Sequence, residues 1–248
     1  MVAALAGVAL IGLFVFTSAA APAYACSTLF DPAPTASPGP GQTPNWGYPQ
    51  DDMGNRHVAV GSKVTYTYCP PASGNHYNAA GQGPILPRVY GPNDKTVPQG
   101  WIHNLEHGAL VLLYRGDSAG ATPEGQQQLK DFFAVFPPSP VCNVAPGTIA
   151  GPVFTRFDSM KTPFAALVWD RVLPLQDLDR AAILAFYSQW GEQLNPELVP
   201  GCARPSPSPS PGASASPSGS PSASPSASPS TSPSASPSAS AAASASPS

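Results

Sequence analysis

Four histidines and a glutamate are the residues of this chain best suited to chemistry. His57, His76, His103 and His107 lie in or beside turn-rich segments, and Glu106 directly precedes the last of them. Neutral imidazole is the commonest protein ligand for metals and suits both zinc and copper. We therefore predict that the histidines bind a transition metal ion, zinc or copper, with Glu106 as a candidate catalytic residue.

The stretch "WIHNLEHGALVLLY", residues 101–114, sets a geometric condition on this site. On a helix, His103 and His107 are neighbours at positions i and i+4 and can share one ion. On a straight strand they would lie about 13 Å apart, at roughly 3.3 Å per residue. Chelation by both therefore requires a helical turn, and Gly108 suits the C-terminal end of such a turn.

Several roles are open to Glu106. It can ligate a metal, orient a histidine or act as a general base. The string "HNLEH" matches the H-x-x-E-H motif of one class of zinc peptidases, but the strand that follows leaves only one turn of their long helix, so the match is weak. An equal alternative is a structural role, in which Glu106 pairs with Arg115 or Arg88.

A second segment, "CPPASGNHY", contains two prolines and a glycine, which predict a rigid loop. We expect the loop to present His76 toward Glu106 and His107. Ser73 suits a turn cap better than a nucleophile, because the segment lacks the G-x-S-x-G form of a hydrolase elbow. The predicted structural residues are Pro70, Pro71, Ser73 and Gly74, with Gly108 after the helical turn.

Apolar periodicity predicts the elements that must position these residues. A strand is expected within 57–68 and a central strand at 109–115, where the apolar run is continuous. The remaining predicted elements are a helix over 122–136, one strand each within 148–157 and 163–175, and a helix over 177–194. From residue 109 the order β–α–β–β–α predicts an α+β fold, a single domain with an antiparallel-type sheet and two helices on one face, as in a ferredoxin-like core.

The two ends of the chain differ in composition from the middle. Residues 1–25 are uncharged and apolar and end in small residues, which predicts an export signal peptide, or a retained membrane anchor as the alternative. Residues 26–50 are predicted to be a Pro/Gly-rich linker and residues 51–202 the globular domain. The Ser/Pro/Ala repeats of residues 203–248 predict a disordered tail that could reach the cell envelope. We expect an exported protein, secreted or held at the cell surface.

The four cysteines fit disulfides in an oxidising compartment. We expect Cys69 to pair with Cys142 inside the domain and Cys26 with Cys202 around it, although the sequence allows three connectivities. Lipidation of Cys26 is a weaker alternative, because the residues before it match a lipobox poorly.

Several of these segments resemble a known bacterial family. The strings "MGNRHV", "YCPPASGNHY", "IHNLEHGALVLLY", "FAALVWDRVLPLQDLD" and "NPE" occur in the order seen in the domain of unknown function 3105 family, over about residues 51–198. Departures from its usual pattern are Ala72 for Thr, Ile102 for Val and Asp170 for Gly. The resemblance implies no reaction, but it places signature residues at His57, Pro70, Pro71, Ser73, Gly74, His76, His103, Glu106, His107 and Gly108.

Three functions remain after composition is considered. The net charge of −3 and the 10% content of charged residues leave no basic patch, so nucleic-acid binding is not expected. The leading hypothesis is an exported metal-binding domain. The alternatives are a non-metal module of the cell envelope, with a His/Glu hydrogen-bond network, and a metal-dependent hydrolase.

Overall fold

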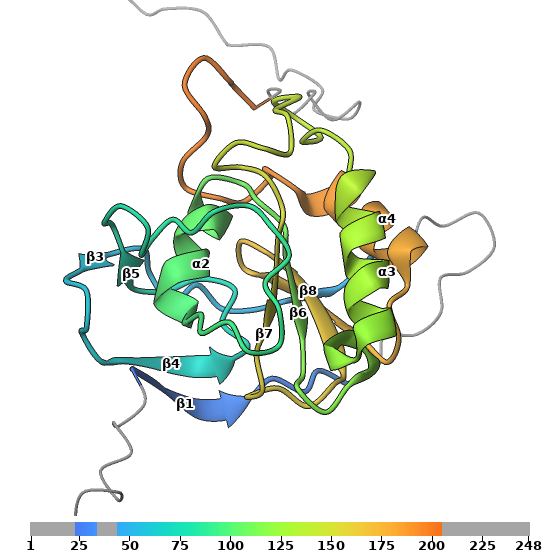
Figure 1. Cartoon of the computed structure of the whole chain (residues 1–248). Helices are drawn as coiled ribbons and strands as arrows, with labels where there is room; N and C mark the ends of the chain where they lie inside the picture. The colour runs from blue at the N-terminus through green and yellow to red at the C-terminus, as the bar shows by residue number, and fades with distance from the viewer. Residues whose placement is uncertain (1–22, 34–43, 205–248) are drawn as a thin grey trace, which may run out of the picture. The chain divides into compact units, whose positions relative to one another are not determined.

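The computed structural model describes residues 23–33 and 44–204 (Figure 1). Its strands are β1 (Tyr24–Leu29), β2 (Tyr48–Pro49), β3 (His57–Val58), β4 (Val64–Cys69), β5 (His76–Tyr77), β6 (Val111–Tyr114), β7 (Val153–Arg156), β8 (Phe164–Val168) and β9 (Arg171–Leu175). Its helices are α2 (Pro98–Glu106), α3 (Pro123–Ala134) and α4 (Arg180–Trp190), with a short 3-10 turn, η1 (Ala119–Ala121).

A five-stranded sheet in the order β2-β9-β8-β6-β7 forms the centre of the fold. The predicted central strand is confirmed, because β6 lies between β7 and β8 and all four of its residues are buried. It runs parallel to β7 and antiparallel to β8. The sheet is therefore mixed, where an antiparallel type was expected.

The expected strand within 163–175 is two strands, β8 and β9, joined by a two-residue turn at Trp169–Asp170. Asp170 adopts a positive φ of 55°, a conformation that aspartate tolerates better than most residues. The order from residue 109 thus becomes β–α–β–β–β–α, and the ferredoxin-like β–α–β–β–α arrangement is not what the chain adopts.

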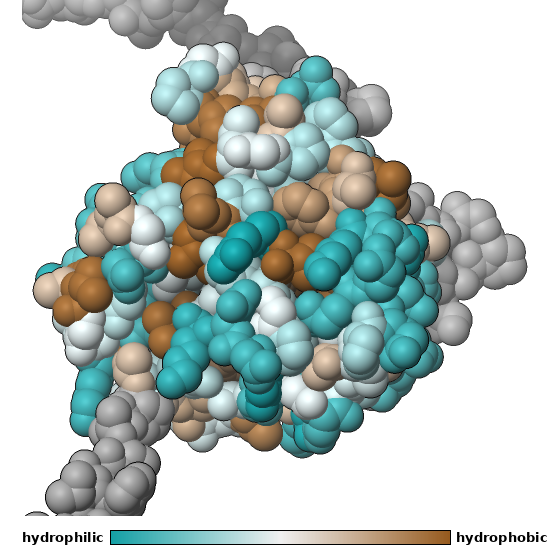
Figure 2. Space-filling model, viewed as in Figure 1, coloured by the Kyte–Doolittle hydropathy of each residue, from teal (hydrophilic) through white to brown (hydrophobic). Residues whose placement is uncertain are grey.

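Two helices pack on one face of this sheet, as predicted. The apolar side of α3 contributes Leu129 and Phe132 to the core, and α4 contributes Ile183 and Phe186. Thr122 caps α3 by accepting a hydrogen bond from Gly125 N (3.0 Å), and Asp179 caps α4 in the same way. The outer side of α3 is hydrophilic (Figure 2), which is the amphipathic pattern of a helix at a domain surface.

The opposite face of the sheet is covered by α2 and the N-terminal strands. Trp101, Ile102 and Leu105 of α2 are fully buried against β6 and β8, with Val64 and Tyr66 of β4 in the same core. The strand expected within 57–68 is broken into β3 and β4 by a turn in which Gly61 has a φ of 86°. These N-terminal elements and α2 carry the histidines.

Part of the segment predicted as a linker is structured. β1 pairs in parallel with β4, and β2 pairs with the edge of the central sheet through β9. The Pro/Gly content of residues 26–50 concealed these pairings because both depend on partners distant in the sequence. Residues 34–43 lie outside the described residues, as do residues 1–22 of the predicted signal segment and residues 205–248 of the predicted tail.

The disulfides join Cys26 to Cys69 and Cys142 to Cys202, so the expected pairing was wrong. β1 lies alongside β4, which ends at Cys69, and this strand pairing brings Cys26 to its partner. The sulfur of Cys26 is thus used in a disulfide, which leaves no thiol there for a lipid. Within the described ranges, no helix has the length and apolar character needed to span a membrane.

Candidate metal site

The smallest sheet of the fold places two histidines side by side. β3 and β5 form a parallel ladder in which His57 and His76 are direct partners. Their rings lie 4.9 Å apart, centroid to centroid. Two residues that lie far apart in the sequence therefore approach one point from adjacent strands.

The loop before β5 fixes the position of His76, as the sequence predicted. Gly74 has a φ of 128°, and a Cβ atom there would lie 2.7 Å from the ring of Tyr66. The hydroxyl of Tyr66 donates a hydrogen bond to the carbonyl of Asn75 (2.8 Å). Only glycine allows the loop to pack this closely on β4 in this conformation.

Polar contacts hold the rest of the loop, and Pro70, Pro71 and Ser73 are all buried. Ser73 Oγ accepts a hydrogen bond from the backbone N–H of Met53 (3.0 Å), so it joins the loop to a preceding segment and does not cap its own turn as expected. The amide of Gln50 donates to the carbonyl of Pro70 (3.1 Å) and accepts from the N–H of Ala72 (2.8 Å). Sequence analysis had not identified Gln50, because its partners follow some twenty residues later.

The helix α2 supplies the other groups and confirms the helical turn that the sequence required. It begins with Pro98 after Val97 and ends with His107 as its C-terminal cap, followed by Gly108 at a φ of 90°. Asn104 anchors it by donating to the carbonyl of Ile85 (2.9 Å) and accepting from the same residue's N–H (3.0 Å). His103 and Glu106, at i and i+3, therefore face β3 and β5.

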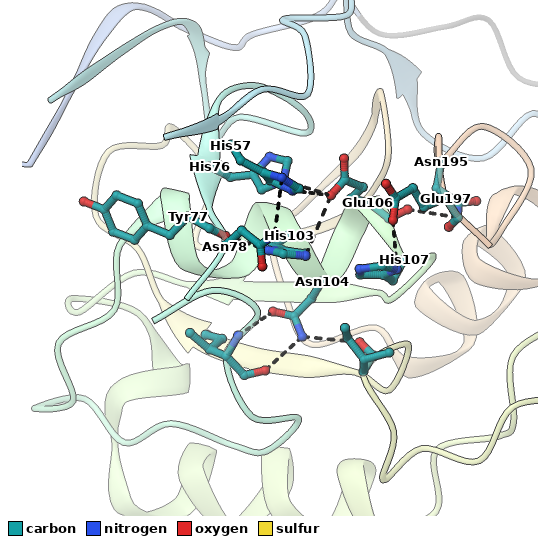
Figure 3. A network of polar contacts seen from close by, with 12 residues as sticks. His57, His76, Tyr77, Asn78, His103, Asn104, Glu106, His107, Asn195 and Glu197 are labelled. Atoms are coloured by element: carbon teal, nitrogen blue, oxygen red, sulfur yellow. Dashed lines mark hydrogen bonds and ion pairs between the residues drawn. The ribbon is translucent and has the colours of Figure 1, made fainter. Parts of the chain in front are cut away.

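Three imidazole nitrogens converge on a single carboxylate oxygen (Figure 3). From Glu106 Oε2, the distance is 2.9 Å to His76 Nε2, 3.4 Å to His57 Nε2 and 3.8 Å to His103 Nε2. All four ligand atoms lie within 4.8 Å of one another. Ligands at about 2.0–2.2 Å from a tetrahedral zinc ion would lie roughly 3.3–3.6 Å apart, so small shifts bring these atoms to coordination distance.

Backbone contacts fix the proton positions on two of the rings. His76 Nδ1 lies 2.8 Å from the carbonyl of Gly74, and His103 Nδ1 lies 2.6 Å from the carbonyl of Tyr77. A carbonyl only accepts hydrogen bonds, so each Nδ1 carries a hydrogen and each neutral ring leaves Nε2 as a bare acceptor. Both Nε2 lone pairs then face the carboxylate of Glu106.

Such an arrangement calls for a positive charge between the groups. Burial lowers the pKa of His103 below its usual 6.5, which disfavours an imidazolium there at neutral pH. Burial also acts to raise the pKa of Glu106, but hydrogen bonding and charge from His76 outweigh it, so the pKa of Glu106 stays below its usual 4.5. The cluster thus combines an ionised carboxylate with a neutral imidazole at His103. The hydrogen bond from His76 to Glu106 needs a hydrogen on His76 Nε2, and a metal ion bound there would take the place of that hydrogen.

Access to the cluster is one-sided. His76 and Glu106 are almost fully buried, at 0% and 1% exposure, whereas the side chain of His57 is 41% exposed. The Nδ1 atom of His57 lies 3.3 Å from the amide nitrogen of Asn78, at the surface. An ion would therefore enter past His57.

A comparison with known proteins assigns the family. The family described as a protein of unknown function (DUF3105) matches residues 57–204. The chain belongs to this family. No curated protein and no solved structure shows significant similarity to it.

In this DUF3105 domain, His107 lies apart from the three-histidine group. Its Nδ1 is 3.9 Å from Glu197 Oε2, and it forms a second group with Glu106 and Glu197. The rings of His103 and His107 stack at 5.1 Å, but their nitrogens serve different groups. The prediction that four histidines share one site is therefore reduced to three histidines and Glu106.

Two further residues of the site were missed, although the string "NPE" contains both. The side chain of Asn195 and the N–H of Glu197 donate to the backbone carbonyl of Glu106, at 3.1 and 3.2 Å. No element was expected around them, so nothing in the pattern linked them to α2. The only signal for these two residues was the string "NPE" itself, which lies in a segment without apolar periodicity.

The surroundings of Glu106 differ from the structural ion pair with an arginine that was the equal alternative. The expected salt bridges to Arg115 or Arg88 are not formed, because these arginines pair with Asp117 and Asp94. Glu106 is buried, and its nearest charged partners are histidines. A general base must be within reach of its substrate. The Glu106 carboxylate is 1% exposed, and its oxygen Oε2 faces the surrounding histidines.

Proposed function

We propose that this domain binds one transition metal ion, zinc or copper, through the Nε2 atoms of His57, His76 and His103 and the carboxylate of Glu106. Three imidazoles and one carboxylate make a four-ligand set that zinc commonly takes, and imidazole also suits copper. The ion would either stabilise the fold or be the cargo of a protein that handles metals.

One observation carries the proposal. His76 and His103 each donate Nδ1–H to a backbone carbonyl, which turns two bare Nε2 atoms toward the same ionised carboxylate. A histidine that ligates a metal typically has its second nitrogen fixed in this way. A cation among these atoms converts a repulsive arrangement into a coordinating one.

The two disulfides support an extracellular setting for this metal site. Disulfides persist in oxidising environments and are rare where thiols are kept reduced. In the proposed function, the domain acts outside the cytosol, at or beyond the cell envelope. The N-terminal segment and the Ser/Pro/Ala tail would serve export and surface placement.

A hydrogen-bond network without metal is the second candidate, and one distance favours it. The 2.9 Å between His76 Nε2 and Glu106 Oε2 is that of a hydrogen bond. It would require His76 to carry a second proton and remain an imidazolium in a fully buried position. In that case the cluster would hold α2 against β5 as a buried ion pair.

Metal analysis of the full chain, exported to an oxidising compartment, separates the two candidates. We expect near-stoichiometric zinc or copper by elemental mass spectrometry, and its loss in Glu106→Gln, which keeps the shape of the side chain and removes its charge. Glu124→Gln, an exposed change at the start of α3, is the matched control and should retain the metal.

The same metal analysis can also overturn the proposal. A wild-type protein that holds no metal after incubation with zinc or copper at neutral pH overturns the proposal. Circular dichroism of each variant must match the wild type, so that metal loss reflects a missing ligand and not an unfolded chain.

A further inference from the structure

We infer that Glu106 bridges two cations, and that His107 and Glu197 bind the second ion beside the one held by the three histidines. This inference rests on the proposed function, because it needs the first site to contain a metal. It assigns a role to the side chains of His107 and Glu197, which the first site leaves unused.

The second group is compact and shares one ligand with the first. Ligand atoms of Glu106, His107 and Glu197 lie within 4.8 Å of one another. Glu106 lies between the three histidines on one side and His107 with Glu197 on the other (Figure 3). A carboxylate has two oxygens and about four lone-pair positions, so one glutamate can bind two cations. Pairs of metals that act together lie roughly 3.5–4 Å apart, a spacing that a shared carboxylate permits.

His107 lacks the contact that would make it a simple hydrogen-bonding residue. Its side chain is 17% exposed, and within the part of the chain that the structure describes its nearest charged partner is Glu197, at 3.9 Å. That gap is too long for a hydrogen bond. It is close to the separation of two ligands on one ion, as in the first group.

The segment that carries Glu197 is held in place by several independent contacts. Asn195 and Glu197 bond to the carbonyl of Glu106, and Arg204 Nη2 donates to Asn195 Oδ1 (2.9 Å). The disulfide between Cys142 and Cys202 fixes its far end. The Glu197 side chain is 54% exposed, so an ion here would keep open positions toward solvent.

A third carboxylate adds negative charge beside this group. Glu192 is 1% exposed and its Cγ packs against Gly108, where a Cβ atom would lie only 2.6 Å away. Its Oε2 accepts from the N–H groups of Val141 and Cys142, at 2.8 and 2.9 Å. Its Oε1 is buried without a hydrogen-bond partner among the described residues. A buried carboxylate with one unpaired oxygen therefore lies next to Gly108, the residue that follows His107.

Metal stoichiometry tests the inference separately from the proposed function. The full chain is dialysed to equilibrium against zinc, and bound zinc per chain is measured for the wild type, for His107→Ala/Glu197→Gln and for the Glu124→Gln control. We expect two ions in the wild type and the control and one in the double variant. No ion in the wild type overturns the proposed function, and with it this inference. One ion in the wild type overturns only the second site, and two ions in the double variant overturn its assignment to His107 and Glu197.

Copper provides a readout of distance that stoichiometry lacks. Two Cu(II) ions bridged by Glu106 should broaden each other's electron paramagnetic resonance signal and give a half-field transition. The double variant should show the spectrum of an isolated ion. An isolated-ion spectrum in a wild-type protein with two bound coppers would place the second ion elsewhere and overturn the inference.

Discussion

At the scale of the residue, the site depends on which ring nitrogen carries a hydrogen. The carbonyls of Gly74 and Tyr77 fix the Nδ1 hydrogens of His76 and His103 and so aim both Nε2 lone pairs at Glu106. The sequence identified all of these side chains, because histidines beside turns and next to a glutamate suggest metal binding. It could not show which ring nitrogens meet the carboxylate, because this depends on the short ladder between β3 and β5, in which His57 pairs with His76.

The pH dependence of metal binding follows from these protonation states. Protons and metal compete for Nε2, so occupancy should fall as the pH drops. Burial lowers the pKa of His103 from 6.5, and the pKa of Glu106 lies below 4.5. We expect occupancy to decline as the pH falls through the range in which His103 becomes protonated, which lies below 6.5. Metal analysis across a pH series checks this, and loss of the ion already above neutral pH would contradict it.

At the scale of the element, the loop before β5 makes a prediction through Gly74. Gly74→Ala would press a Cβ against the Tyr66 ring, while Gly81→Ala, at a φ of 73°, meets nothing within 4 Å. Both pay the cost of a left-handed backbone, roughly 1–2 kcal/mol. Only Gly74→Ala adds overpacking, typically 1–3 kcal/mol, and displaces His76. Gly74→Ala should lower both the free energy of unfolding, measured in urea, and the metal affinity by more than Gly81→Ala does. Equal effects of the two substitutions would contradict this account of the loop.

A second element-scale prediction concerns the β8–β9 turn. Asp170 has a φ of 55°, a backbone conformation that glycine adopts without strain. Burial raises its pKa to about 6, with hydrogen bonding to Ser73 opposing the shift and Asp52 adding to it. The folded state therefore prefers the protonated carboxyl, and the ionised form costs stability above pH 6.

Asp170→Asn and Asp170→Gly should both stabilise the protein at neutral pH. The advantage of Asp170→Asn over wild type should shrink as the pH falls through about 6 toward 3.8, because the wild-type carboxyl becomes neutral in the folded state. Thermal melts of the three proteins across this range measure the gap. A gap that is constant with pH would show that the Asp170 carboxyl is not buried as described.

The elements themselves were predictable where the pattern was local. The helices predicted over 122–136 and 177–194 are confirmed as α3 and α4, and each is capped by the residue just before its first turn. The strand β1 was missed because it spans the boundary between the predicted signal segment and the predicted linker, and its partner is the distant strand β4. The β8–β9 turn was missed because Asp170 stands where a glycine would have signalled it.

At the scale of the whole molecule, an ion bound at the proposed site would stabilise the folded chain. A ligand that binds only the folded state at 100 times its Kd adds about 2.7 kcal/mol to the free energy of unfolding. For a domain of this size that corresponds to roughly 5–10 °C in Tm. We expect zinc to raise the Tm of the wild type by this order and to leave Glu106→Gln unchanged. An equal rise in both proteins would show that zinc acts elsewhere.

The disulfide connectivity yields a further prediction for the molecule as a whole. Non-reducing peptide mapping should recover Cys26 linked to Cys69 and Cys142 linked to Cys202. Replacing Cys142 and Cys202 by serine should cost about 2–4 kcal/mol of stability, because the bond restricts the unfolded chain. A peptide that links Cys69 to Cys142 would contradict the strand pairing of β1 with β4.

The most direct test of the central claim is an anomalous difference map from crystals of the zinc-loaded protein, recorded at the zinc edge. The account predicts a peak about 2.0–2.2 Å from the Nε2 atoms of His57, His76 and His103 and from the Glu106 carboxylate. A map with no peak among these residues, and His76 hydrogen-bonded directly to Glu106, would contradict it and leave the cluster as a buried ion pair.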